Sequence, residues 1–166
     1  MTYRTLTVED YPTYNALRGM ALDTVPEAFG STNQEENPHR KSRFQSNVTY
    51  KYSFIMGAFD REKLVGMVGF MNSGKIKMQH KGIIWGMFVK PDMQGRGIGA
   101  ELMKNTLQKA TKISRIQKIN LDVNAENKAA IHLYEKLGFT SFGLEKNALL
   151  VDGKMYDTIL MSKIVK

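Results

Sequence analysis

The residues with the clearest chemical potential form a glycine-rich segment in mid-chain, Gln94-Gly95-Arg96-Gly97-Ile98-Gly99. Glycine has no Cβ atom, so a phosphate group can approach its backbone closely. An apolar run at 82–89 precedes the segment and predicts a buried strand, and apolar residues at helical spacing over 98–113 follow it. The first N–H groups of that helix lack partners within the helix and can bind an anion. The segment therefore predicts a pyrophosphate site, to which Arg96 adds a positive charge.

Two familiar kinds of phosphate-binding turn do not fit this segment. A dinucleotide-binding loop requires the spacing G-x-G-x-x-G, and the phosphate loop of nucleoside triphosphatases requires Lys and then Ser or Thr after its last glycine. Here Gly99 is followed by Ala100 and Glu101. From the segment alone, a glycine turn that binds no ligand also stays open.

A second group of residues with chemical potential lies about 25 residues further on. Residues 119–124 alternate between apolar and polar side chains, which predicts a strand, and residues 127–137 have the pattern of a helix that ends at a glycine. The helix carries the motif Asn127-x-x-Ala130-x-x-Leu133-Tyr134-x-x-x-Gly138-Phe139. Its tyrosine is a potential proton donor.

Together these two motifs resemble those of the GNAT N-acetyltransferase superfamily. The pattern Gln94-x-x-Gly97-x-Gly99 resembles that family's acyl-CoA signature, Q/R-x-x-G-x-G/A, and it follows a strand ending in Val-x-Pro, as the signature does. The second motif resembles the family's next one, which supplies an asparagine on the cofactor side and a tyrosine near the thiol. The resemblance is firmest over residues 52–142.

The resemblance implies an acetyl-CoA-dependent N-acetyltransferase, in which a primary amine attacks the thioester directly within a ternary complex. Tyr134 would then be the general acid, and a backbone N–H of strand 82–89 would stabilise the oxyanion. Gly86 would mark a bend in that strand. The alternative for the strand is ordinary buried core, and for Tyr134 a helix residue with its hydroxyl at the surface. The residues implied to bind the cofactor are Met87, Phe88, Val89, Gln94, Gly95, Arg96, Gly97, Ile98, Gly99, Ala100, Asn127, Ala130 and Tyr134.

The sequence does not show which residue acts as general base. Some members of the family carry a glutamate on the strand before the turn, but residues 82–89 contain no carboxylate or histidine. A water relay is then the default. Glu27, beside Pro26, is a candidate base or a contact for a cationic acceptor, as are Glu35 and Glu36. No role is expected for either His80 or His132.

Composition limits the function classes further. The chain has 166 residues, of which 42% are hydrophobic and 24% charged, so we expect a single domain over 1–166. It has no cysteine, which excludes disulfides, thiolate metal sites and a cysteine nucleophile, and we expect no metal cofactor. It has neither a leader-like opening nor an apolar run long enough to cross a membrane, so we expect a cytoplasmic protein without a membrane partner.

The formal charge of +8 favours anionic partners, which include both coenzyme A and nucleic acid. A basic run extends along the helix after the turn and into the next loop, and we interpret it as a solvated helix face. No motif of a nucleic-acid-binding protein accompanies it, so we expect no specific nucleic-acid partner. A homodimer stays open. The run consists of Lys104, Lys109, Lys112, Arg115 and Lys118.

The remaining elements are predicted from periodicity and turn residues. Their order, β-α-α-β-β-β-α-β-α-β-β, resembles the GNAT fold, an α/β (α+β) architecture with a mixed sheet of about seven strands flanked by four helices. Residues 23–51, which would shape the acceptor pocket, have no signature of one substrate. Small amines, polyamines, antibiotics, amino acids and protein N-termini all stay open, and the alternative function is a catalytically silent acyl-CoA sensor or scaffold. The other predicted elements are strands 3–7, 52–59, 64–70, 144–151 and 154–164, and helices 8–22 and 33–46.

Overall fold

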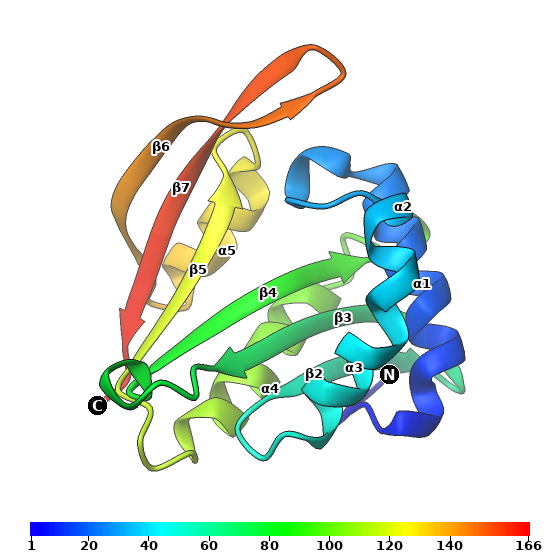
Figure 1. The fold of residues 1–166 in the computed structure, drawn as a ribbon, viewed down its shortest axis with the longest axis horizontal. Coiled ribbons are helices and arrows are strands. Elements are labelled where there is room, and N and C mark those ends of the chain that lie inside the picture. Colours follow the sequence, from blue (N-terminus) through cyan, green and yellow to red (C-terminus); the bar gives the residue numbers. More distant parts are fainter.

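The computed structural model describes residues 1–166, which form one mixed sheet with helices on both faces (Figure 1). The sheet has seven strands in the order β1-β2-β3-β4-β5-β7-β6, which confirms the predicted fold class. The strands are β1 (Thr2–Thr5), β2 (Phe54–Asp60), β3 (Lys63–Asn72), β4 (Lys81–Val89), β5 (Lys118–Asn124), β6 (Thr140–Val151) and β7 (Lys154–Ile164). The helices are α1 (Tyr11–Thr24), α2 (Asn33–Glu36), α3 (Arg40–Thr49), α4 (Ile98–Thr111) and α5 (Lys128–Lys136).

The second predicted helix, 33–46, is broken in the middle. A 3-10 helix, Asn37–His39, separates the single turn of α2 from α3. Pro38 lies in this break, and proline has no N–H with which to continue the α-helical hydrogen bonds. α2 and α3 together occupy the place of that helix, so the four expected helical segments flank the sheet.

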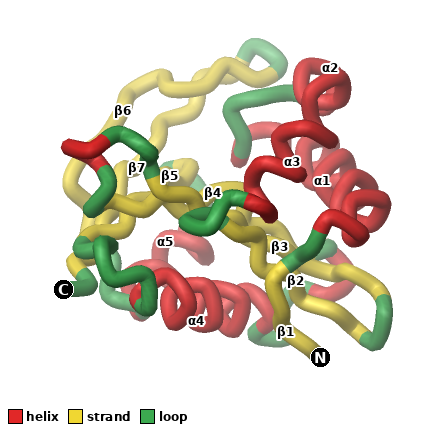
Figure 2. The backbone as a smooth tube through the Cα atoms, turned by 60° about the horizontal axis from the view of Figure 1, so that its bottom comes forward, coloured by secondary structure: helices red, strands yellow, loops and turns green.

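Alternation along the strands divides the interior into two apolar cores. On β2, Met56 belongs to the core beneath α4 and α5, whereas Ile55 belongs to the core beneath α1 and α3. Figure 2 shows these two groups of helices on opposite sides of the strands. No helix is both long and apolar enough to cross a membrane.

The parallel pair β4 and β5 separates soon after it begins. Only Lys81, Gly82 and Ile83 of β4 pair with β5, and the two strands then diverge, as Figure 1 shows. Gly86 has φ +66°, which confirms the predicted bend in β4. Beyond Ile83, the edge of β4 that faces β5 has no strand partner, so its backbone groups are free to bind a ligand.

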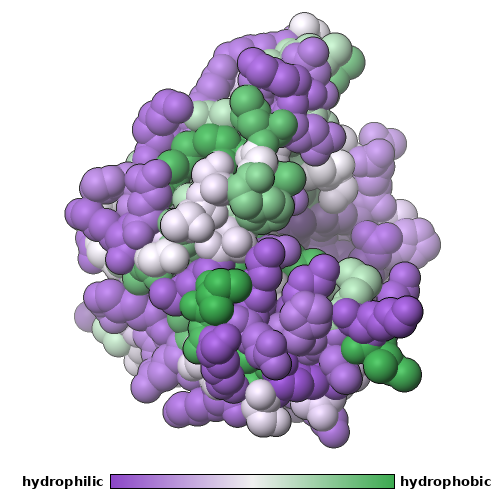
Figure 3. All heavy atoms as spheres, turned by 90° about the vertical axis from the view of Figure 1, so that its left-hand side faces the viewer, coloured by the Kyte–Doolittle hydropathy of each residue, from purple (hydrophilic) through white to green (hydrophobic).

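The other side of the sheet ends in the long hairpin of β6 and β7. It turns at Asp152 and Gly153, which have φ +48° and +80°, as expected for a tight hairpin turn. β6 begins four residues before the predicted position and carries exposed apolar side chains, among them Phe142 and Leu144. In Figure 3, apolar atoms on the face seen from the left of Figure 1 are interspersed with hydrophilic ones.

Candidate functional site

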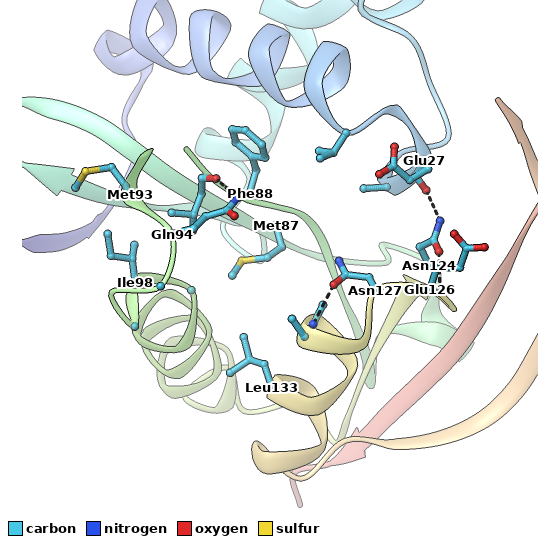
Figure 4. A pocket seen from close by; sticks show the side chains of 18 of the residues that line it. Glu27, Met87, Phe88, Met93, Gln94, Ile98, Asn124, Glu126, Asn127 and Leu133 are labelled. Carbon is cyan, nitrogen blue, oxygen red and sulfur yellow. Dashed lines mark hydrogen bonds between the residues drawn. The ribbon is translucent and has the colours of Figure 1, made fainter. Parts of the chain in front are cut away.

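A cavity of about 720 Å³ lies where β4 and β5 diverge (Figure 4). Its walls come from the end of β4, the first turns of α4 and α5, and the 3-10 helix Pro26–Ala28. Most of the residues predicted to bind a cofactor line this cavity, as does Glu27. These are Met87, Phe88, Val89, Gln94, Gly95, Gly97, Ile98, Gly99, Asn127 and Ala130. Arg96, Ala100 and Tyr134 do not line it.

The glycines of the turn have two different kinds of surroundings. Gly95 and Gly97 have φ +73° and +75°, a backbone conformation that favours glycine, and Gly97 is the N-cap of α4. No atom lies within 4 Å of the position that a Cβ would take at either residue, so both leave open space at the start of the helix. At Gly99, by contrast, a Cβ would lie 2.9 Å from Cε of Met87, the end of a flexible side chain that would have to shift. The turn is thus a cradle that side chains would fill.

Two polar side chains near the turn bind the protein backbone. Nε2 of Gln94 donates a hydrogen bond to the carbonyl of Val89 at 3.0 Å, which ties the turn to the end of β4. Nη2 of Arg96 donates to the carbonyl of Asp92 at 3.1 Å, and its side chain stays outside the cavity. A contact between Arg96 and a phosphate would require the side chain to leave this position.

Asn127 begins α5 and faces the cavity, as Figure 4 shows. Its Oδ1 accepts a hydrogen bond from the backbone N–H of Ala130 at 3.1 Å, so the side chain caps the helix. A cap explains asparagine here without any ligand. Its amide nitrogen is not used by the cap and is available to the cavity.

Tyr134 lines a smaller cavity of about 70 Å³ that adjoins the large one. The two cavities share five lining residues, among them Met87 and Asn127. Tyr134 is only 6% exposed, and burial raises its pKa to about 12. The phenol is therefore neutral at ordinary pH and can donate a hydrogen bond or a proton near Met87.

Asp122, which the sequence analysis did not single out, lines the small cavity together with Tyr134. Partial burial, and then the nearby charge of Glu145, raise the pKa of its carboxyl group. Asp122 lies on the polar side of β5, whose alternate residues Ile119 and Leu121 enter the core. The alternation was visible in the sequence, but only the folded sheet shows that this polar side borders the cavity.

The carboxylates considered in the sequence analysis lie in different places. Glu27 lines the large cavity but not the small one, and its backbone carbonyl accepts a hydrogen bond from Nδ2 of Asn124 at 3.0 Å. Glu35 accepts a hydrogen bond from the backbone N–H of Thr32 at 2.8 Å, in the capping box of α2. Glu36 is buried against Arg18. Neither Glu35 nor Glu36 lines the large or the small cavity.

Comparison with known proteins supports the resemblance to the GNAT family. Residues 16–139 match the model of the acetyltransferase (GNAT) family. Spermidine N(1)-acetyltransferase of Vibrio cholerae is 30% identical over 107 residues, which are 62% of this chain and 60% of that protein. N-alpha-acetyltransferase RimI of Mycobacterium tuberculosis is 29% identical over 119 residues, 71% of this chain and 72% of that protein. The matches to the spermidine acetyltransferases thus span only 50–60% of those proteins.

Solved structures share the fold over nearly the whole chain. A GNAT-family acetyltransferase from Streptococcus pneumoniae has a TM-score of 0.85 and 22% identity, with 99% of both chains covered. An acetyltransferase from Salmonella typhimurium, solved with its cofactor acetyl-CoA, has a TM-score of 0.86 and 16% identity, with 99% of this chain and 94% of that chain covered.

Proposed function

The chain belongs to the acetyltransferase (GNAT) family, and from that membership we propose that it transfers an acetyl group from acetyl-CoA to a primary amine. The observation that carries the proposal is the glycine turn at the start of α4, which opens onto the large cavity at the unpaired edge of β4. Direct attack within a ternary complex is the expected route, because the sequence offers no cysteine to carry an acyl group.

The residues around the cavity suggest how acetyl-CoA binds. The pyrophosphate sits on the turn Gly95–Gly99, where the first N–H groups of α4 and open space are available. The pantetheine arm follows the unpaired edge of β4 and hydrogen-bonds to the backbone of Met87 to Val89. Asn127 and Ala130 contact the arm from α5. The acetyl end then lies near Met87, which lines both cavities.

The proposed reaction needs two proton transfers. A backbone N–H of Met87 or Phe88 polarises the thioester carbonyl while the neutral amine attacks the carbonyl carbon, giving a tetrahedral oxyanion. The nitrogen passes a proton to Asp122, directly or through water, and the carbon–sulfur bond breaks. Tyr134 protonates the departing thiolate and regains its proton from water. Asp122 is preferred over Glu27 as the proton acceptor because it lines the same small cavity as Tyr134.

The alternative is a catalytically silent module that binds acyl-CoA as a sensor or scaffold. Both functions predict that coenzyme A raises the melting temperature, since a ligand that binds only the folded state stabilises it. Only the enzyme releases free thiol from acetyl-CoA in the presence of an amine. We expect thiol release above the rate of hydrolysis with at least one member of a broad amine panel. Stabilisation without such release would favour the silent module.

The finer expectations from the sequence stay predictions. A metal-independent enzyme keeps its activity after treatment with a chelator. Sedimentation velocity tests for the homodimer, and fractionation of the source cells tests the cytoplasmic location.

A further inference from the structure

A separate cavity of about 220 Å³ shares Trp85 with the small cavity that Tyr134 lines. It is lined by residues of α1, α2, α3, β3 and β4 and contains an excess of positive charge. Arg18, Arg40 and Arg43 line it, and Glu36 is its single carboxylate. The arginines are brought together from α1 and α3, so the cluster is not visible as a run in the sequence.

Glu36 offsets only one of these three positive charges, and its carboxylate is already bound by neighbouring side chains. It accepts hydrogen bonds from Nε of Arg18 at 3.0 Å, Nη2 of Arg18 at 2.6 Å and Oγ of Ser31 at 2.9 Å. Burial acts to raise its pKa, but the hydrogen bonds and charges of Arg18, Ser31 and Arg40 hold the pKa below its usual value. Glu36 is therefore ionised, and the cluster keeps a net positive charge.

Three buried donors around this cavity have no hydrogen-bond acceptor. They are Nη1 of Arg18, Nε of Arg40 and Nε1 of Trp85. Arg18 and Arg40 are 7% and 4% exposed, and Nε of Arg40 lies 3.6 Å from Glu36, beyond hydrogen-bond distance. Buried donors are rarely left unpaired, because an unmet hydrogen bond is costly. The cavity therefore suits a ligand group that is negatively charged and offers acceptors only.

Arg18 also connects this cavity to the proposed reaction site. The central carbon of its guanidinium lies 4.7 Å from the ring centroid of Phe29 and 5.8 Å from that of Trp85. A Cβ at Gly86 would lie 3.4 Å from Nη1 of Arg18. Phe29, Trp85 and Gly86 all line the small cavity that contains Tyr134. The unpaired Nη1 thus lies at the bend of β4, one residue before Met87.

We propose that the amine acceptor carries a carboxylate group, as an amino acid does. Its carboxylate accepts hydrogen bonds from Nη1 of Arg18 and Nε1 of Trp85, within the positive field of Arg40 and Arg43, and its amine lies in the small cavity near Asp122. This inference rests on the proposed acetyl transfer. A polyamine such as spermidine fits poorly, because it would place a second cation against the arginines.

Matched acceptors test the proposal. Each carboxylate acceptor is compared with its carboxamide, and the acceptors are amino acids, β-alanine and 4-aminobutyrate. Spermidine and the corresponding phosphonates are tested beside them. Thiol release gives kcat/KM for each compound. We expect the best carboxylate to exceed its carboxamide by at least about tenfold, as loss of one charge-assisted hydrogen bond would produce. Equal use of the two, or a preference for spermidine or the phosphonate, would overturn the proposal.

Trp85→Phe is the sharpest variant, because it keeps an aromatic ring over Gly69 and removes only the indole N–H among the polar atoms. We expect KM for the carboxylate acceptor to rise about 10-fold to 100-fold. The ratio of kcat/KM for the carboxylate to kcat/KM for its carboxamide should fall, because a hydrogen bond to a charged acceptor contributes more than one to a neutral acceptor. An unchanged KM for the carboxylate contradicts the proposed contact.

A pair of variants tests the anion site independently, in case Trp85→Phe folds poorly. Arg43→Gln removes an exposed cavity charge, and Lys41→Gln removes a charge from the same helix outside the cavity. We expect weaker carboxylate binding for Arg43→Gln alone. Equal effects of the two variants would argue against an anion site.

Calorimetry measures acceptor binding to protein saturated with coenzyme A. It tests the carboxylate site separately from the proposed acetyl transfer. Carboxylate-selective binding without thiol release leaves the anion site standing and contradicts the acetyltransferase. Thiol release with amines but without carboxylate selectivity supports the acetyltransferase and contradicts the anion site.

Discussion

Tyr134 is the proposed catalytic residue whose role can be tested most directly. Tyr134→Phe keeps the ring packed against Phe139 and loses only the hydroxyl. General acids contribute about 100-fold to 10,000-fold in rate, and the raised pKa makes this phenol a weak donor, so we expect a fall in kcat near the lower end of about 100-fold. Pre-steady-state measurement of acyl transfer isolates the chemical step from product release. Tyr3→Phe, on the edge strand β1, is the matched control. A chemical step of unchanged rate in the Tyr134 variant would remove the residue from the mechanism.

For Asp122, we predict that substitution by asparagine changes stability and activity in opposite directions. Its pKa is raised in the folded protein, so the unfolded chain loses this proton at lower pH. The wild type therefore loses stability as pH rises from the unfolded pKa through the folded one. Asp122→Asn removes that loss, so its advantage in melting temperature should grow over this window while acetyl transfer falls. Melting curves and rates from about pH 3 to 8 check both effects.

Glu145→Gln gives the corresponding control. The charge of Glu145 contributes to the raised pKa of Asp122, so the variant should shift the rise of kcat/KM with pH to lower pH and keep the maximal rate. A pH profile that is unchanged in Glu145→Gln, or full activity in Asp122→Asn, would show that another group takes the proton.

The sequence identified some residues of the candidate site and missed others. Tyr134 and Asn127 could be found because both belong to one short motif that resembles the second motif of the GNAT family. Asp122 and Trp85 could not, because their meaning depends on neighbours that are distant in sequence, such as Glu145 and Arg18. Glu36 was considered as a candidate base, but in the fold it is the partner of Arg18.

Among the elements, α4 begins at a glycine for which a matched pair of variants distinguishes blocked cofactor binding from backbone strain. Gly97 and Gly153 have φ +75° and +80°, and no atom lies within 4 Å of a Cβ at either position. Glutamate at either residue thus meets similar backbone strain, about 1–2 kcal/mol for a left-handed conformation. Only at Gly97 does the carboxylate enter the proposed phosphate space. We expect Gly97→Glu to weaken acetyl-CoA binding sharply and Gly153→Glu to leave it unchanged, both with similar losses in melting temperature. Normal binding by folded Gly97→Glu would make the turn purely structural.

Most elements could be predicted from local patterns. The strand, turn and helix around Gly97 follow from apolar periodicity and glycine spacing within 32 consecutive residues, 82–113. The sequence does not predict the break in the second helix. A proline such as Pro38 is also common in the first turn of a helix, so its presence does not fix where a helix ends. The divergence of β4 from β5 follows from no local pattern, since periodicity indicates that a strand exists but not which neighbour it leaves.

At the scale of the whole molecule, the charge of +8 is distributed over groups that the fold partly engages. Nζ of Lys104 lies 2.7 Å from Glu101, and the guanidinium carbon of Arg115 lies 3.5 Å above the ring of Tyr52. Nζ of Lys118 lies 5.1 Å from the ring centroid of Phe142. Arg115 and Lys118 lie beyond the end of α4, and each contacts an aromatic ring, so the contacts do not favour a continuous nucleic-acid interface along the helix.

We therefore expect only weak, sequence-independent binding of nucleic acid. Contacts dominated by phosphate lose affinity steeply as salt rises from about 50 to 200 mM. Fluorescence anisotropy with unrelated duplexes should show similar affinities at low salt and none at physiological salt. Reversing the charge of Lys104, Lys109 and Lys112 should abolish the residual binding and leave kcat/KM for acetyl transfer unchanged, because none of the three lines the large cavity or the one around Tyr134. A sequence-selective complex that persists at physiological salt would instead make this helix face a recognition surface, and the charge of +8 would then serve a partner other than the cofactor.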